Sequence, residues 1–245
     1  MNQGTYPLAA SMINQINRLD QISNNLANVN TNGFKQEGTT ETTFNYYLQR
    51  AQENNTVPTK NNIVTNNVPK IDGKFINSEM GPIAMTGNTL DFALNNPDTF
   101  FKIQNADGDI VYSRDGAFKN LDNFLVDSNG NNVLNANNEP IVIEDNFTSQ
   151  VGVVKIPYTN LEKIGDNTYS IKDANTIEIF ENNNNLIVQG AIEKSNVNSV
   201  SAMVELIDAH RRFDQSQKAI KSIDELNSGL IDKIVMFLSM IKSDP

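Results

Sequence analysis

The sequence predicts an α+β protein in which long N- and C-terminal helices form a coiled-coil-like domain around an inserted antiparallel all-β domain. Apolar residues recur at heptad spacing near both ends, whereas short apolar runs separated by turn signals fill the middle. No helical pattern of 10–15 residues alternates with those runs, which argues against a parallel α/β sheet. We therefore expect a discontinuous helical domain, with an extended connector, at residues 1–69 and 193–245, and a β domain at residues 70–192.

The C-terminal helix is predicted from Asn198 to about Ile241 because two apolar rows run along it. The first row is Leu206, Phe213, Ile220, Asn227, Ile234 and Ile241, with Asn227 as its polar member. The second row is Ala209, Ser216, Ile223, Leu230 and Phe237. A helix of this length spans roughly 60 Å, and so amphipathic a helix needs a partner helix in this chain or in a neighbouring one.

A comparable stripe lies at the other end, from Tyr6 to Val29. One heptad row is Met12, Leu19 and Leu26; a second is Ile22 and Val29, with Ile13 and Ile16 expected on the same face. Two ordinary core helices of one globule would give the same periodicity, and this alternative stays open. We take the following residues as assembly-seam positions: Met12, Leu19, Leu26, Leu206, Phe213, Ile220, Asn227, Ile234 and Ile241.

The segment after the first helix begins with Asn32-Gly33, a strong turn or helix C-cap signal in which Gly33 can adopt a positive φ. Residues 39–49 are expected to form a short helix or strand, and residues 51–68 are expected to form a polar connector. Further on, short apolar runs predict strands, and hairpin turns are expected at Asp107-Gly108, Asp115-Gly116 and Asn129-Gly130. The predicted strands lie near residues 75–76, 83–85, 90–94, 100–103, 110–112, 125–126, 133–134, 141–143, 151–156, 169–171, 177–180 and 186–188.

Composition excludes several classes of function. The net charge of −10 argues against binding nucleic acid or anionic lipid, which need Lys and Arg for their phosphates. The absence of Cys excludes disulfides, thiolate nucleophiles and Cys-ligated metals. No apolar run approaches the ~20 residues of a membrane-spanning helix. The first residues lack the basic and apolar regions of a cleavable signal peptide, so a cytoplasmic protein is expected unless another export route exists.

No residue pattern indicates catalysis, and we expect no cofactor, no metal site and no small-molecule substrate. His210 is the sole His, and it lies within the predicted C-terminal helix. The run that starts at Asp127 resembles a calcium loop, but an EF-hand needs Gly at the sixth position and Glu at the twelfth, where this chain has Asn132 and Asn138. A hairpin turn explains that run more simply. Paired carboxylates are not excluded by residue type, yet no two are marked as a pair.

Residues 22–35 (ISNNLANVNTNGFK) closely resemble the N-terminal signature of bacterial flagellar rod and hook proteins. Residues 86–94, followed by residues 100–101 and 112–118, resemble the β-domain signature of that family. Residues 190–198 resemble the segment that precedes its C-terminal helix. The resemblance spans nearly the whole chain in the family's order. Length and the segment 211–225 are most similar to the proximal rod proteins; distal rod proteins typically read Gln-Arg-Ala-Tyr where residues 210–213 read His-Arg-Arg-Phe.

The resemblance implies a non-enzymatic structural subunit that assembles helically into the drive shaft crossing the periplasm. Its partners would be other rod subunits, copies of itself and the flagellar type III export apparatus, which requires no cleaved signal peptide. Export substrates of this kind carry a Phe-x-x-x-hydrophobic gate motif, which Phe44 and Leu48 match, although a core Phe and Leu explain the same residues. Two other classes remain as alternatives: a secreted or surface β-domain binding module on a coiled-coil stalk, and a carboxylate-dependent enzyme.

Overall fold

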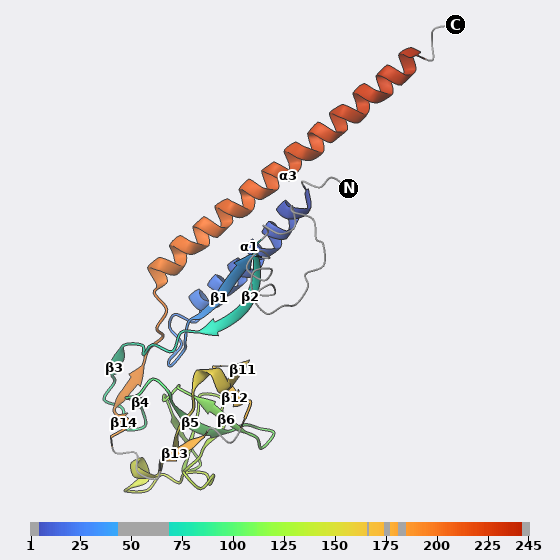
Figure 1. Ribbon diagram of the computed structural model, residues 1–245. Coiled ribbons are helices and arrows are strands. Elements are labelled where there is room, and N and C mark those ends of the chain that lie inside the picture. The colour runs from blue at the N-terminus through green and yellow to red at the C-terminus, as the bar shows by residue number, and fades with distance from the viewer. Residues whose placement is uncertain (1–4, 44–68, 166, 174–176, 181–184, 242–245) are drawn as a thin grey trace, which may run out of the picture. The chain divides into compact units, whose positions relative to one another are not determined.

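A computed structural model describes residues 5–43, 69–165, 167–173, 177–180 and 185–241 of the 245-residue chain (Figure 1). The predicted α+β class is confirmed: long helices occur near both ends, and the strand pairs of the central region are antiparallel. The chain divides into two units. The helical unit comprises residues 1–24, 38–75 and 200–245, and the β unit comprises residues 25–37 and 76–199.

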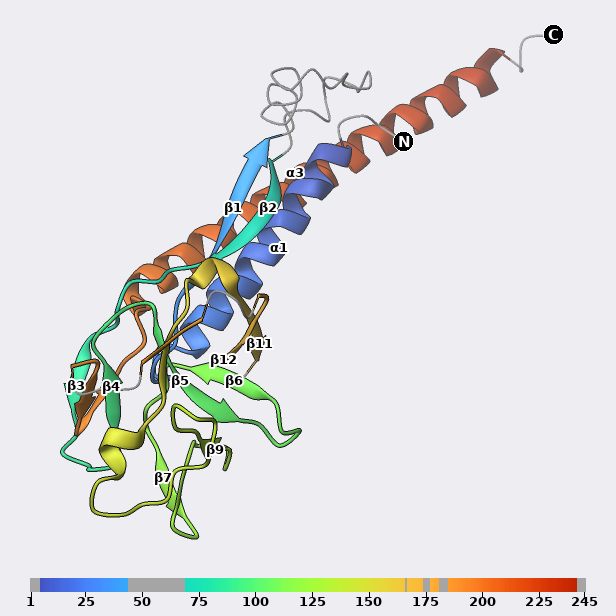
Figure 2. The ribbon, with the colours of Figure 1, turned by 60° about the horizontal axis from the view of Figure 1, so that its bottom comes forward.

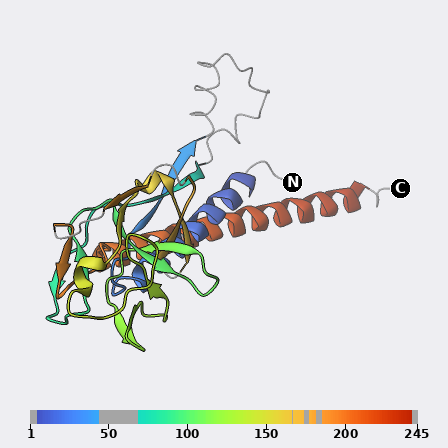
Figure 3. The same cartoon turned by 90° about the horizontal axis from the view of Figure 1, so that it is seen from below.

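The helical unit contains α1 (Thr5–Ala27), α3 (Ser199–Ile241) and the paired strands β1 (Glu37–Thr43) and β2 (Pro69–Ile76). Helix α3 runs unbroken for 43 residues, within a residue or two of the predicted bounds (Figure 1, Figure 3). In the two-stranded ribbon, the Phe75 ring covers Gly38 so closely that a Cβ on Gly38 would lie 2.1 Å from the ring. No helix among the described residues combines the length and the apolar character needed to cross a membrane.

The β unit is built on a nine-stranded sheet, and Figure 2 shows four of its strands, β11, β12, β6 and β5, side by side. The strand order is β11-β12-β6-β5-β9-β8-β7, and β10 pairs with both β5 and β13. The smaller sheets are β14-β4 and β15-β3. The strands are β3 (Ile83–Met85), β4 (Phe92–Leu94), β5 (Thr99–Gln104), β6 (Ile110–Ser113), β7 (Lys119–Leu121), β8 (Phe124–Val126), β9 (Asn132–Val133), β10 (Val153–Lys155), β11 (Leu161–Gly165), β12 (Thr168–Ile171), β13 (Glu178–Phe180), β14 (Ile187–Gln189) and β15 (Ala191–Glu193).

Three loops of the β unit repeat one hydrogen-bond pattern, and they begin at Asn105, Asp127 and Asn135. In each loop, the side-chain Oδ1 of the first residue accepts from the backbone N–H groups of the second and fourth residues that follow it. The residue three positions after the first has a positive φ in each loop: 89° at Gly108, 88° at Gly130 and 66° at Asn138. The Asp127 carboxylate is therefore committed to closing a turn, as the hairpin interpretation of this run predicts.

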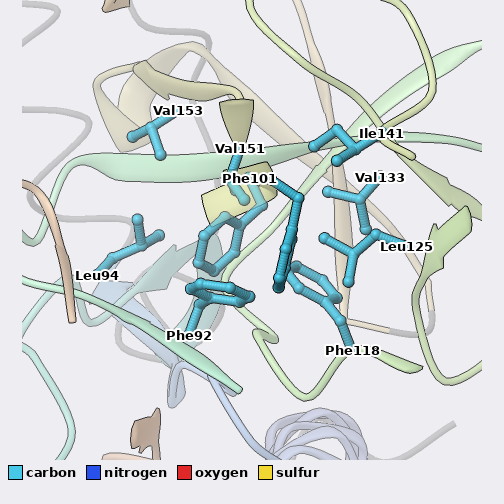
Figure 4. Close-up of a cluster of buried hydrophobic side chains, with 10 residues drawn as sticks. Phe92, Leu94, Phe101, Phe118, Leu125, Val133, Ile141, Val151 and Val153 are labelled. Carbon is cyan, nitrogen blue, oxygen red and sulfur yellow. The ribbon is translucent and has the colours of Figure 1, made fainter. Parts of the chain in front are cut away.

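The core of the β unit consists of two apolar clusters. In the first, the Phe92 and Phe101 rings lie 6.0 Å and 5.1 Å from the ring of Phe118 (Figure 4). The second cluster consists of Phe100, Tyr112, Val154, Ile156, Leu161 and Tyr169. One predicted strand, at residues 141–143, is absent: Val142 makes only an isolated bridge to Phe124. In this segment, alternating apolar residues therefore correspond to packing in the core but not to a paired β-strand.

The hydroxyl groups of Tyr158 and Tyr169 are buried without a hydrogen bond among the described residues, and burial raises the pKa of both phenols. In the unfolded chain a phenol ionises near pH ~10. Above that pH the unfolded state loses protons that the folded state keeps, so stability falls as pH rises. We expect part of the phenolate absorbance to appear only together with loss of the circular-dichroism signal, and that part to decrease in a Tyr158→Phe/Tyr169→Phe variant, in which the buried Tyr112 remains. Complete ionisation of all tyrosines near pH ~10 in a still-folded protein would contradict this.

Candidate assembly surfaces and a buried ionic joint

One face of α3 is shielded from solvent along the first two thirds of the helix. The shielded side chains follow each other at alternating spacings of four and three residues, which is the heptad pattern. They are Ala202, Leu206, Ala209, Phe213, Ser216, Ile220, Ile223 and Asn227. Of these, Ala202 and Ala209 are fully buried, and such small side chains allow close approach of other segments. The predicted seam positions Leu206, Phe213, Ile220 and Asn227 all lie in this stripe and are half-buried.

The shielding of that face ends at Asn227, although the apolar pattern continues. Leu230, Ile231, Ile234 and Val235 are each between 58% and 61% exposed. The predicted seam position Ile234 is therefore left exposed by the part of the chain that the structure describes. The side chain of Ile241, the last predicted seam position, lies outside the described residues.

Helix α1 also has one shielded face. Its predicted seam residues Met12, Leu19 and Leu26 are half-buried, and Ile22 is buried. Ile13 and Ile16 were expected to share the face of Ile22, and that prediction is wrong because both are exposed. Their separations from Ile22, nine and six residues, rotate them by about 180° and 120° around the helix. The pairing of α1 with α3 as a coiled coil stays a prediction.

Within the β unit, the side chains of Lys35, Arg114 and Glu193 form a buried ionic cluster, which we call the ionic joint. The Lys35 Nζ lies 2.8 Å from Glu193 Oε1, and Arg114 Nη2 lies 2.7 Å from Glu193 Oε2. All three side chains are at most 1% exposed. Lys35 precedes β1, Arg114 follows β6, and Glu193 ends β15, so the ionic joint connects three distant parts of the sequence.

The ionic joint holds two cations for one carboxylate, and backbone dipoles balance the extra positive charge. Lys35 Nζ donates to the carbonyl of Glu79 at 2.6 Å, while Glu193 Oε1 also accepts from the N–H of Gly81 at 2.8 Å. Burial and then the neighbouring Arg114 lower the pKa of Lys35, an effect that Glu193 opposes. Arg114 Nη1 donates to the carbonyl groups of Asn96, Pro97 and Thr99. Each of the three charged side chains thus has an oppositely charged partner and backbone hydrogen bonds, although the cluster keeps one excess positive charge.

The segment that follows α1 is held against the same place by backbone contacts. Gly33 N–H donates to the carbonyl of Glu193 at 2.7 Å, and Gly33 has a φ of 68°. Phe34 is buried, and Lys163 Nζ lies 4.3 Å from its ring centre. The backbone N–H of Gln36 donates to the side-chain carbonyl of Asn196 at 2.7 Å. The Asn32-Gly33 turn predicted from sequence is therefore a docking element of the β unit.

Comparison with known proteins gives three family models, each matching one part of the chain. Residues 9–35 match the model described as "Flagella basal body rod protein". Residues 96–156 match "Flagellar hook protein FlgE/F/G D1 domain", and residues 188–232 match "Flagellar basal body rod FlgEFG protein C-terminal".

Similar curated proteins cover nearly the whole chain. The flagellar basal-body rod protein FlgG of Borreliella burgdorferi is 31% identical over 92% of this chain and 96% of its own length. FlgG of Buchnera aphidicola from Schizaphis graminum is 30% identical over 86% of this chain and 92% of its own. This chain belongs to the flagellar basal-body rod protein family. FlgF of Rhizobium meliloti is also similar, at 29% identity over 96% of this chain and 97% of its own length.

The ionic joint is composed of one residue from each region in which this rod protein matches a family model. Lys35 ends the first matched region, Arg114 lies in the second and Glu193 lies in the third. Sequence analysis singled out the segments around these residues as signatures, but it assigned them no physical role. One sequence signal could have indicated the ionic joint. Each of its charged residues lies within an otherwise apolar or Gly-containing motif, where a solvent-exposed charge is not expected.

Three further expectations from the sequence concern His210, a metal site and the proposed gate residues. His210 is exposed on α3. Among the described residues, no group of three or more His, Asp or Glu side chains is arranged to hold a metal ion. The proposed gate residues Phe44 and Leu48 lie outside the described residues, so that motif stays a prediction.

Proposed function

We propose that this structural subunit of the basal-body rod is a proximal-type subunit with no enzymatic activity. In this proposal it is exported by the flagellar type III apparatus without a cleaved signal peptide. It then assembles helically in the periplasm with copies of itself and with axial rod neighbours. The observation that carries the proposal is the apolar face of α3, which continues uncovered beyond Asn227 for the rest of the described side chains. Such a face is stabilised only when another helix covers it.

The distribution of polar groups supports a structural rather than an enzymatic role. The most deeply buried charges, those of Lys35, Arg114 and Glu193, are matched by each other and by backbone groups. The carboxylates of Asp91 and Asp127 accept hydrogen bonds that close turns. These side chains fasten segments of the fold together, which supports a structural role.

The assignment to the proximal type rests on the residues at 210–213, His-Arg-Arg-Phe, which differ from the distal-type pattern. Similar relatives carry both names, FlgF and FlgG, at comparable identity. The distal rod subunit is therefore the second candidate within the same family. Export through the gate motif at Phe44 and Leu48 is part of the proposal, with the resemblance to other export substrates as its support.

Electron microscopy of basal bodies from a strain that lacks this gene tests the proposal. Because distal subunits build on proximal ones, loss of a proximal-type subunit should leave basal bodies without a rod, and the cells should be non-motile. A short rod that ends early would instead indicate the distal type. Full-length rods in the deletion strain would overturn the proposed function, provided that the gene is expressed in the parent strain.

A further inference from the structure

Helix α3 carries two apolar stripes, one near each end, that no other segment among the described residues covers. The tail stripe is Leu230, Ile231, Ile234 and Val235. The back stripe is Val200, Met203, Val204 and Ile207, whose side chains are between 51% and 70% exposed. Four large side chains with this exposure amount to an apolar patch on the order of a few hundred Å², a size that marks interaction sites on soluble proteins.

The two stripes face different directions. Leu230 and Ile234 lie three and seven residues beyond Asn227, so the tail stripe continues the shielded face of α3 with unchanged spacing. The back stripe has the spacing i, i+3, i+4, i+7, and at 100° per residue its centre lies roughly 150° around the helix from that face. About 29 residues separate the two centres, which corresponds to roughly 44 Å along the helix axis.

We propose that the tail stripe of one copy of this chain docks on the back stripe of the next copy. This inference rests on the proposed function, because it names the partner that covers the uncovered face. The observation that favours a second copy is that one chain displays both surfaces, each apolar and about two helical turns long. The tail stripe is also continuous with a face that the protein already uses for packing.

The placement of the stripes on one helix determines what kind of assembly results. A contact between two different surfaces is heterologous, so each docking event leaves one free tail stripe and one free back stripe at the ends. Separated by roughly 44 Å and facing apart, the stripes of two copies do not satisfy each other in a closed pair. The contact therefore propagates. It is smaller than the ~1,200 Å² of a standard stable interface, so a single contact is weak and an array of them is stable.

Cysteine cross-linking tests this contact cleanly because the sequence contains no Cys. Purified full-length Val204→Cys and Ile234→Cys proteins are mixed at high concentration and treated with a short bis-maleimide linker. We expect the mixed 204–234 dimer to exceed both homodimers, and a protein that carries both substitutions to give a ladder of multimers. Lys218→Cys is the matched control, since Lys218 is exposed on the same side of α3 as Val204 but in a polar part of it.

Two results would overturn the proposal. Dominant 234–234 dimers would show that the tail stripe pairs with itself. Equal cross-linking of Ile234→Cys with Val204→Cys and with Lys218→Cys would show that the back stripe is not the partner of the tail stripe. The deletion strain separates this failure from failure of the proposed function. If the deletion strain lacks rods but the 204–234 cross-link does not form, the role in the rod stands and only the proposed contact is refuted.

Discussion

Replacement of Glu193 by Gln should destabilise the β unit by about 3–5 kcal/mol, the usual effect of removing one partner of a buried ion pair. The variant keeps the size of the side chain but leaves Lys35 and Arg114 buried and without a counter-ion. Both cations then repel each other in a region from which water is excluded. Since a domain is stable by only ~5–15 kcal/mol, a loss of this size is readily measured by urea unfolding followed by circular dichroism.

Two companion variants make this prediction specific to the ionic joint. Glu178→Gln removes an exposed carboxylate that pairs with Lys155 at 3.7 Å, and it should change the stability by less than ~1 kcal/mol. Lys35→Met removes one cation and leaves the Arg114–Glu193 pair balanced, so its loss should be smaller than that of Glu193→Gln. If Glu193→Gln and Glu178→Gln unfold at the same urea concentration, the ionic joint contributes nothing and the argument is wrong.

Local periodicity was sufficient to predict the helices. The a/d spacing in α3 follows from contacts that repeat every three or four residues, and the predicted bounds agree with Ser199–Ile241. The same reasoning misplaced Ile13 and Ile16 on α1, because apolar character alone does not tell which of two apolar faces is covered. A helix that presents apolar residues on opposite faces, as α3 also does at Val200 and Val204, needs knowledge of its partners.

The strands of the β unit were predicted where an apolar run met a Gly-containing turn. The hairpin of β7 and β8 was missed because its two turn residues, Asp122 and Asn123, adopt positive φ values of 51° and 72° without glycine. Strand β15 was also missed as a strand, since its three residues Ala191–Glu193 include a charge that is buried only through the ionic joint. Neither the hairpin nor strand β15 has a local sequence signal strong enough to outweigh the average strand and turn propensities of its residues.

The ionic joint itself could not be predicted, because its residues are far apart in sequence. Lys35 and Glu193 are 158 positions apart, and each resembles an ordinary surface charge when it is considered alone. Only the fold shows that the turn after α1, the end of β6 and the end of β15 meet at one buried point. A sequence without aligned relatives contains no record of such long-range pairs.

The Gly33→Ala substitution should be strongly destabilising, because residue 33 lies against backbone atoms beside the ionic joint. A Cβ at Gly33 would lie 2.5 Å from the backbone carbonyl carbon of Arg114 and 2.8 Å from the nitrogen of Asp115. Both are backbone atoms, which cannot move aside as a side chain can. The positive φ adds ~1–2 kcal/mol for any L-residue, and the steric overlap adds ~1–3 kcal/mol, for a total loss of ~2–5 kcal/mol.

Gly130→Ala is the matched control for the conformational part of this cost. Gly130 has a φ of 88°, also in the left-handed region, but nothing lies within 4 Å of where its Cβ would be. It should therefore lose only the ~1–2 kcal/mol of backbone strain. The difference between the two variants, measured by urea unfolding, isolates the close approach of residue 33 to Arg114. Equal losses in both variants would mean that the segment after α1 does not dock on the β unit in solution. A larger loss in Gly33→Ala, together with failure of that variant to restore motility, would show that this docking is needed before the terminal helices assemble.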